Sequence, residues 1–139
     1  MSHPLDDFDR YSVLVYMLAE RHHLITNSSL SLARIGATLA KLEGGIECHG
    51  ALRLEVWELI DFSTHRIRHY SYEVYHGAEK VRWYGHWEHP EIPELTATFP
   101  HHKHLPPTLR LNRVPAPGLC FDAPNLPFVL EEVWRECQP

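Results

Sequence analysis

Apolar residues near the start of the chain recur at the spacing of a helix. These positions are Phe8, Tyr11, Val15 and Leu18. Acidic residues precede them, where the dipole of a helix favours negative charge. The pattern predicts a helix over about residues 7–22. Residues 25–31 are small and polar, which is typical of a connection.

Alternation of apolar and polar residues then predicts four strands. The expected strands are residues 32–42, 51–62, 65–75 and 80–87, and the breaks between them are Gly44-Gly45, Ser63-Thr64 and His76-Gly77. Connections this short join antiparallel neighbours, because a parallel crossover needs about a dozen residues or more. We therefore expect a four-stranded antiparallel meander sheet.

Prolines become frequent after Trp87, and proline interrupts strand ladders. We expect an ordered proline/histidine-rich loop here, with residues 86–104 lying against the polar face of the last two strands. Asn125 can then cap a C-terminal helix that has Pro127 in its first turn. The expected fold is a single α+β domain over residues 1–139, with one helix at each end of the sheet and loop.

Residues two apart in a strand point to the same face of a sheet. The sequence of the last two expected strands therefore predicts that one face is polar. If Val74 and Val81 mark the core side, the opposite face carries His69, Ser71, Glu73, Arg82, Tyr84 and His86. These side chains could cleave RNA without a metal: a base takes the proton of a 2′-hydroxyl, an acid protonates the leaving oxygen, and an arginine stabilises the phosphorane. The candidate catalytic residues are Arg82, His69, Glu73, Tyr84, His86, His102 and His104. A solvated face without catalysis is the competing interpretation.

Histidines near the proline-rich segment offer a second chemistry. The candidate metal ligands are His86, His89, His101, His102 and His104. They could hold Zn²⁺ or another transition metal in a non-catalytic binding or regulatory module, whereas the metal-independent reading needs no cofactor. Lys103 lies inside this cluster, and histidines in such a loop can also simply hydrogen-bond its backbone. A third interpretation is a partner protein that docks through the aromatic sheet face.

Composition and charge narrow the class of protein. The chain is 44% hydrophobic and 22% charged, as in ordinary globular domains. It has neither a membrane-length apolar run nor a leader pattern, so we expect a cytoplasmic protein without a membrane partner. The net charge is −5, yet residues 64–113 carry seven Lys or Arg against five Glu. The overall charge therefore does not exclude RNA as a partner.

Short motifs in the second half of the chain resemble those of a toxin family. They are His69-Tyr70-Ser71-Tyr72-Glu73-Val74-Tyr75, Val81-Arg82-Trp83-Tyr84, His89-Pro90-Glu91 and Phe99-Pro100-His101-His102-Lys103-His104. This set resembles the TumE family, the toxins of a type II toxin-antitoxin system. The likeness runs from the second expected strand to the terminal helix.

The resemblance implies a small prokaryotic toxin that is neutralised by a helix-turn-helix antitoxin encoded by the adjacent gene. It implies an endoribonuclease, or an inhibitor of translation with RNA or the ribosome as target. Tyr84-Gly85 stands where the family pattern has an Asp after the Arg-aromatic pair. The missing acidic residue argues against a mechanism that depends on it, and it leaves open a degenerate toxin.

Overall fold

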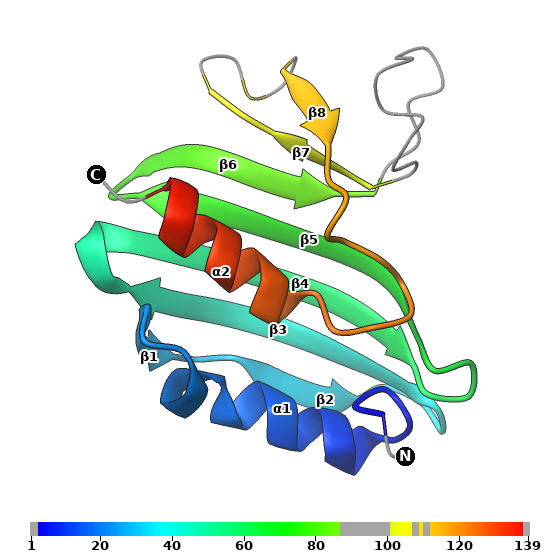
Figure 1. Ribbon diagram of the computed structural model, residues 1–139. Coiled ribbons are helices and arrows are strands. Elements are labelled where there is room, and N and C mark those ends of the chain that lie inside the picture. Colours follow the sequence, from blue (N-terminus) through cyan, green and yellow to red (C-terminus); the bar gives the residue numbers. More distant parts are fainter. Residues whose placement is uncertain (1–2, 87–100, 107–108, 110–111, 138–139) are drawn as a thin grey trace.

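A computed structural model of the chain describes residues 3–86, 101–106, 109 and 112–137. The elements, in chain order, are α1 (Phe8–Arg21), β1 (Ile25–Ser28), β2 (Ser31–Arg34), β3 (Leu39–Cys48), the 3-10 helix η1 (His49–Ala51), β4 (Leu52–Asp61), β5 (Arg66–His76), β6 (Glu79–Gly85), β7 (His102–His104), β8 (Arg113–Pro115) and α2 (Leu126–Glu136). The strands form one antiparallel sheet in the order β1-β3-β4-β5-β6-β7-β8, and β2 also pairs with β3 (Figure 1). The α+β class is confirmed, but the described residues form eight strands where four were expected.

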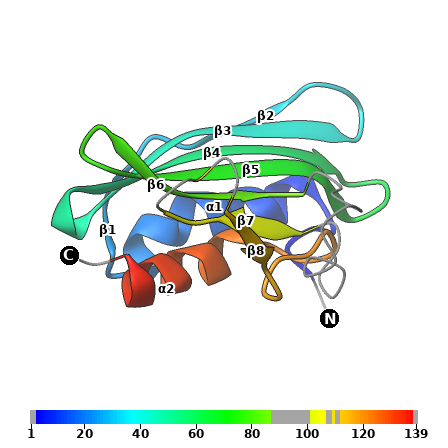
Figure 2. The ribbon, with the colours of Figure 1, turned by 90° about the horizontal axis from the view of Figure 1, so that it is seen from above.

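Both helices lie on the same face of the sheet (Figures 1 and 2). They bury apolar side chains against it: Tyr11, Val15 and Leu18 from α1, and Leu126, Val129, Leu130 and Val133 from α2. No described helix covers the opposite face, which we call the uncovered face. None of the helices in the described part of the chain is long and apolar enough to cross a membrane.

The two helices occur close to where the sequence predicts them. Asp7 caps α1, since its side chain accepts a hydrogen bond from the backbone N–H of Arg10 at 2.8 Å. Pro127 lies in the first turn of α2, as expected. Asn125 precedes α2, but its side chain does not cap it. The amide instead binds the backbone of Cys120, through both its oxygen and its nitrogen.

Gly44 explains why the first strands were predicted wrongly. It has a φ of 138° within β3, and a Cβ there would collide with the carbonyl oxygen of Ser29. This close approach lets β1 and β2 pair with successive parts of one continuous β3. The expected connection over residues 25–31, the single strand over 32–42 and the break at Gly44-Gly45 are therefore wrong.

A β-bulge at Val81 changes which side chains of β6 face the helices. Val74 pairs with Arg82, whereas Tyr75 pairs with Lys80, so Val81 is an extra residue. Val81 packs against the edge of the core, and Arg82 beside it is also turned toward the helices. The expectation that Arg82 and Tyr84 lie on the uncovered face is wrong, because the pattern of alternation carries no sign of the bulge.

The proline-rich tail also joins the sheet. β7 pairs with β6 and β8 pairs with β7, although both strands are only three residues long. Residues 102–104 were expected in a loop against the sheet face, and they instead extend the sheet at its edge. Residues 87–100, which include His89 and the end of the expected fourth strand, lie outside the described residues.

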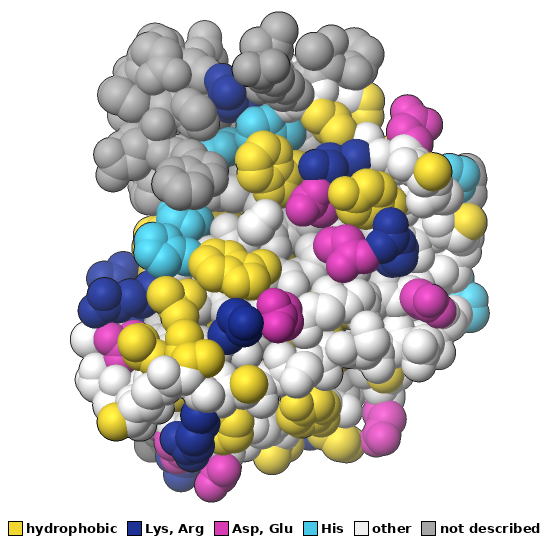
Figure 3. All heavy atoms as spheres, turned by 180° about the vertical axis from the view of Figure 1, so that it is seen from behind, with side chains coloured by type: hydrophobic (Ala, Val, Ile, Leu, Met, Phe, Trp, Pro, Cys, Tyr) yellow, Lys and Arg dark blue, Asp and Glu magenta, His cyan; other side chains and the backbone are white. Residues whose placement is uncertain are grey.

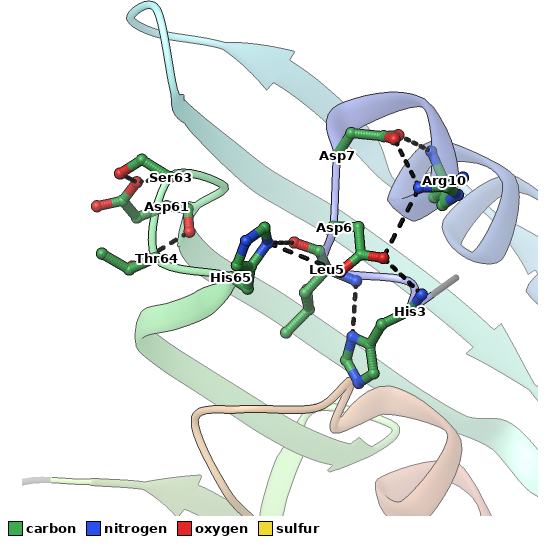
Figure 4. A network of polar contacts seen from close by, with 9 residues as sticks. All are labelled: His3, Leu5, Asp6, Asp7, Arg10, Asp61, Ser63, Thr64 and His65. Atoms are coloured by element: carbon green, nitrogen blue, oxygen red, sulfur yellow. Dashed lines mark hydrogen bonds and ion pairs between the residues drawn. The ribbon is translucent and has the colours of Figure 1, made fainter. Parts of the chain in front are cut away.

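The start of β5 is held by the N-terminal segment (Figure 4). In the turn before β5, His65 Nδ1 lies 3.2 Å from the carbonyl oxygen of Leu5 and 3.7 Å from the Asp6 carboxylate. Asp61 accepts hydrogen bonds from both the N–H and the hydroxyl of Ser63. The β4–β5 turn is therefore fixed at both ends, and with it the strand that carries the candidate site.

Glu58 is a fully buried carboxyl between α1 and the sheet. The hydroxyls of Tyr11 and Tyr72 both donate hydrogen bonds to it. Burial raises the pKa of Glu58 from 4.5 to about 7, although the two hydroxyls act in the opposite direction. The three side chains join α1, β4 and β5 through one polar contact in the core.

We expect Glu58→Gln to stabilise the protein at alkaline pH. The folded state raises this pKa, so the stability that the bound proton contributes is present in full below pH 4.5 and is lost as pH rises through about 7. At about pH 8 the wild type has lost about 3 kcal/mol of its free energy of unfolding. The side chain of the Glu58→Gln variant does not titrate, so the variant does not lose this stability. Urea unfolding across about pH 5 to 8 measures this difference, with exposed Glu47→Gln as control. An unchanged pH dependence in Glu58→Gln would contradict the assignment.

Candidate functional site

The uncovered face contains a groove around His69. One cavity, of about 380 Å³, is lined by Trp57, His69, Tyr70, Ser71 and His86. A second, of about 360 Å³, is lined by Thr64, Arg66, Ile67, Arg68, His69 and Phe121. The cavities meet at His69, and we call them together the His69 groove. Figure 3 shows histidine and hydrophobic side chains next to one another on this face of the molecule, with both basic and acidic side chains around them.

Two histidines meet in the groove, one in β5 and the other directly after β6. His69 Nδ1 lies 3.3 Å from His86 Nε2, and the ring centres are 5.1 Å apart. Burial and the neighbouring His69 lower the pKa of His86, so its imidazole is neutral at neutral pH and can accept a proton. His69 is exposed at the surface of the groove. The structure thus brings together two of the residues that the sequence analysis proposed as catalytic.

Local strand geometry gives His69 its position. Tyr70 and Tyr72 are buried on the helix side, which leaves His69 and Ser71 on the other side of β5. The pairing of β4 with β5 shifts between Leu59 and Ile60, so Arg68 is an extra residue in the ladder. This irregularity places Arg68 in the same cavity as His69.

Tyr70 and His101 form a second contact next to the histidine pair. Tyr70 Oη lies 2.5 Å from His101 Nδ1, and burial lowers the pKa of His101 to about 4. His101 is therefore neutral, and its Nδ1 can accept the hydroxyl proton of Tyr70. The ring of Phe121 packs against both His101 and His86, at 4.6 and 5.4 Å between centres. His101 was expected only as a metal ligand, and no functional role was expected for Tyr70.

Two arginines provide positive charge at one end of the groove. Arg66 Nε lies 3.1 Å from Asp122, and Arg68 Nη2 lies 3.2 Å from Asp61. Both arginine side chains are about half exposed. The pair of Arg66 with exposed Asp122 contributes little to stability, and buried Asp61 keeps its hydrogen bonds from Ser63 if Arg68 moves away. Their guanidinium groups can therefore turn from these carboxylates to a phosphate, whose oxygens match the planar donor fork.

Arg82 and Tyr84 lie on the helix side, in a set of charged residues that we call the Glu132 cluster. Its members are Arg82, Tyr84, Lys103, Glu132 and Glu136. Glu132 of α2 accepts hydrogen bonds from Tyr84 Oη at 2.7 Å, Lys103 Nζ at 2.9 Å and Arg82 Nη1 at 3.3 Å. Burial acts to raise the pKa of Glu132, but these donors and their charge outweigh it and lower the pKa. Sequence reasoning missed Glu132, because a charge on a helix usually faces solvent.

The remaining candidates are also placed outside the groove. Glu73 accepts a hydrogen bond from Tyr75 Oη at 2.9 Å and pairs with Lys80. His102 and His104 are buried in β7, where the ring of His104 stacks on Trp83 at 4.5 Å. None of these three is among the described residues that line the His69 groove.

The proposed metal ligands form no recognisable metal site in the part of the chain that the structure describes. There, no group of three or more His, Cys, Asp or Glu side chains is arranged to hold a metal ion. His101 Nδ1 contacts Tyr70, and His104 Nδ1 lies 2.6 Å from the carbonyl oxygen of Leu109. His89 lies outside the described residues.

Comparison with known proteins identifies one family. A family model described as Toxin TumE matches residues 15–139, a span that includes every residue lining the His69 groove and the whole Glu132 cluster. Comparisons with curated proteins and with solved structures found no match.

We expect Arg82→Ala to destabilise the fold, because Arg82 belongs to the Glu132 cluster. If Arg82 lay on the uncovered face, as the sequence predicted, the variant would instead be stable and inactive. Removing one partner of a buried ion pair leaves the other charge uncompensated, which costs about 3 kcal/mol. The melting temperature should fall by about 10 °C, while the exposed α2 residue Arg135→Ala should change it little. Equal melting temperatures for both variants would show that the cluster does not hold α2 in place.

Proposed function

The chain belongs to the TumE family of toxins, and we propose that it acts by cleaving RNA in the His69 groove without a metal ion. A toxin of this kind implies an antitoxin that neutralises it. The observation that carries the proposal is the contact between His69 and His86 in an accessible groove. One histidine is exposed and the other is partly buried with a lowered pKa, which are the different environments that an acid and a base require.

The groove residues account for each step of an internal transesterification. Neutral His86 accepts the proton of the RNA 2′-hydroxyl, and the 2′-oxygen then attacks the adjacent phosphorus. The bond from phosphorus to the 5′-oxygen breaks, and protonated His69 gives its proton to that oxygen. The products are a 2′,3′-cyclic phosphate and a 5′-hydroxyl, and solvent restores both histidines to their starting forms.

Arg66 and Arg68 supply the charge that this reaction needs. The phosphorane carries more negative charge than the starting phosphodiester, so a nearby guanidinium stabilises it more than the substrate. This role belonged to Arg82 in the sequence analysis. Arg82 is engaged by Glu132 and Glu136 on the other side of the sheet, whereas Arg68 shares a cavity with His69.

The partner that fits this proposal is a helix-turn-helix antitoxin encoded by the adjacent gene. The target is RNA, free or within the ribosome, and the protein acts in the cytoplasm. The seven basic against five acidic residues over 64–113 give this segment a surplus of positive charge, which RNA binding favours.

We expect His69→Ala and His86→Ala each to slow RNA cleavage by about 10²- to 10⁴-fold, because each removes a proton-transfer group. His49→Ala is the matched control, since His49 is an exposed histidine in η1, before β4 begins. Cleavage is followed on gels with EDTA present. The wild-type rate should rise with pH through the lowered pKa of His86, and that rise should vanish in His86→Ala. Wild-type rates in both variants would rule out the histidine pair.

We also expect expression of this protein alone to slow bacterial growth, and co-expression of the adjacent gene to restore it. The double variant His69→Ala, His86→Ala should allow normal growth at the same protein level, because the groove can no longer move protons. Growth curves with matched immunoblots provide the measurement. Normal growth at high levels of the folded wild-type protein would exclude toxicity.

A further inference from the structure

Trp57 is unusual among the exposed hydrophobic residues of the described chain. The others, Val13, Tyr16 and Ile35, lie on α1 or in the turn after β2, whereas Trp57 lies in the central strand β4 and is 38% exposed. Its neighbours Val56 and Glu58 face the helices, so Trp57 faces the His69 groove and lines it. A large aromatic surface at the centre of a sheet, beside proton-transfer groups, is suited to stacking on a ligand ring.

The ring of Trp57 is oriented for such stacking. It lies nearly parallel to the ring of His69, at an interplanar angle of 24° and 6.4 Å between centres. The cavity that both rings line has a volume of about 380 Å³, within the range of small-ligand sites. A planar base that stacks on Trp57 therefore has its sugar and phosphate within reach of His69 and His86.

Ser71 supplies a directional polar contact in the same cavity. It pairs with Trp57 across β4 and β5, and its Oγ lies 2.8 Å from Trp83 Nε1. An indole N–H can only donate, so Ser71 Oγ accepts this bond and keeps its own proton to donate. Trp83 thus orients Ser71 as a donor into the groove.

The geometry points to a nucleobase site in which a base of single-stranded RNA stacks on Trp57 and accepts a hydrogen bond from Ser71 through a carbonyl oxygen. Uracil, cytosine and guanine present such an oxygen, and adenine does not. Single strands are required because a duplex hides the faces and pairing edges of its bases. This inference rests on the proposed function, which it extends from the reaction to the choice of substrate.

The test measures binding separately from cleavage. Oligonucleotides with 2′-O-methyl groups cannot be cut by the proposed reaction, and end-labelled oligo(U) and oligo(A) report affinity by fluorescence anisotropy. We expect Trp57→Ala to weaken binding of both by about tenfold or more, and Trp57→Phe to retain most of it. Ser71→Ala should lower the preference for oligo(U) over oligo(A) by about 2- to 10-fold. Tyr16→Ala, an exposed aromatic on α1, is the matched control and should change neither affinity.

Each outcome bears on one proposal. Wild-type affinity and base preference in both Trp57→Ala and Ser71→Ala would overturn the nucleobase site, even if ordinary RNA were still cleaved. If binding depends on Trp57 but RNA without 2′-O-methyl groups is not cleaved, the cleavage proposal is overturned and the nucleobase site is retained. If Trp57→Ala does not fold, Ser71→Ala decides the question: a lowered preference for oligo(U) supports the base site, and an unchanged preference overturns it.

Discussion

The carboxylate of Glu132 holds helix α2 against the strands β6 and β7. Arg82 and Tyr84 of β6 and Lys103 of β7 all donate to it, so one side chain of α2 fastens two neighbouring strands. A buried carboxylate without a partner is strongly destabilising. The position of α2 and the positions of β6 and β7 therefore depend on one another. The candidate site depends on this arrangement, because His86 directly follows β6 and His101 directly precedes β7.

The two faces of the sheet have different roles: the helix side stabilises the fold, and the uncovered side carries the candidate site. On the helix side, Glu58 and Glu132 are buried and bound by hydroxyl, ammonium and guanidinium donors, which leaves them little freedom to act on a ligand. On the uncovered side, His69, Ser71 and Trp57 stand on paired strands and face a groove. A rigid sheet holds catalytic and binding groups more precisely than loops do, and this favours the uncovered face as the site for the proposed RNA substrate.

Sequence periodicity was sufficient where the backbone is regular. It predicted α1 and α2 closely, and alternation along β5 placed His69 on the face opposite the buried Tyr70 and Tyr72. It failed where one residue breaks the period: the bulge at Val81 turns Arg82 toward α2, and β3 continues through Gly44, where a break between strands was expected. Trp57, Glu132 and the role of His101 depend on contacts across the fold, which spacing along the chain cannot reveal. The exposed Trp57 within an apolar strand was the signal that could have been followed.

The most direct measurement of the proposed chemistry is the structure of the RNA ends produced by the purified, untagged protein in EDTA. We expect every new 3′ end to carry a 2′,3′-cyclic phosphate and every new 5′ end to carry a hydroxyl, because the nucleophile is the neighbouring 2′-oxygen. Products with 5′-phosphate and 3′-hydroxyl ends, formed only when a divalent metal is added, would contradict this mechanism and indicate a metal-activated water as the nucleophile.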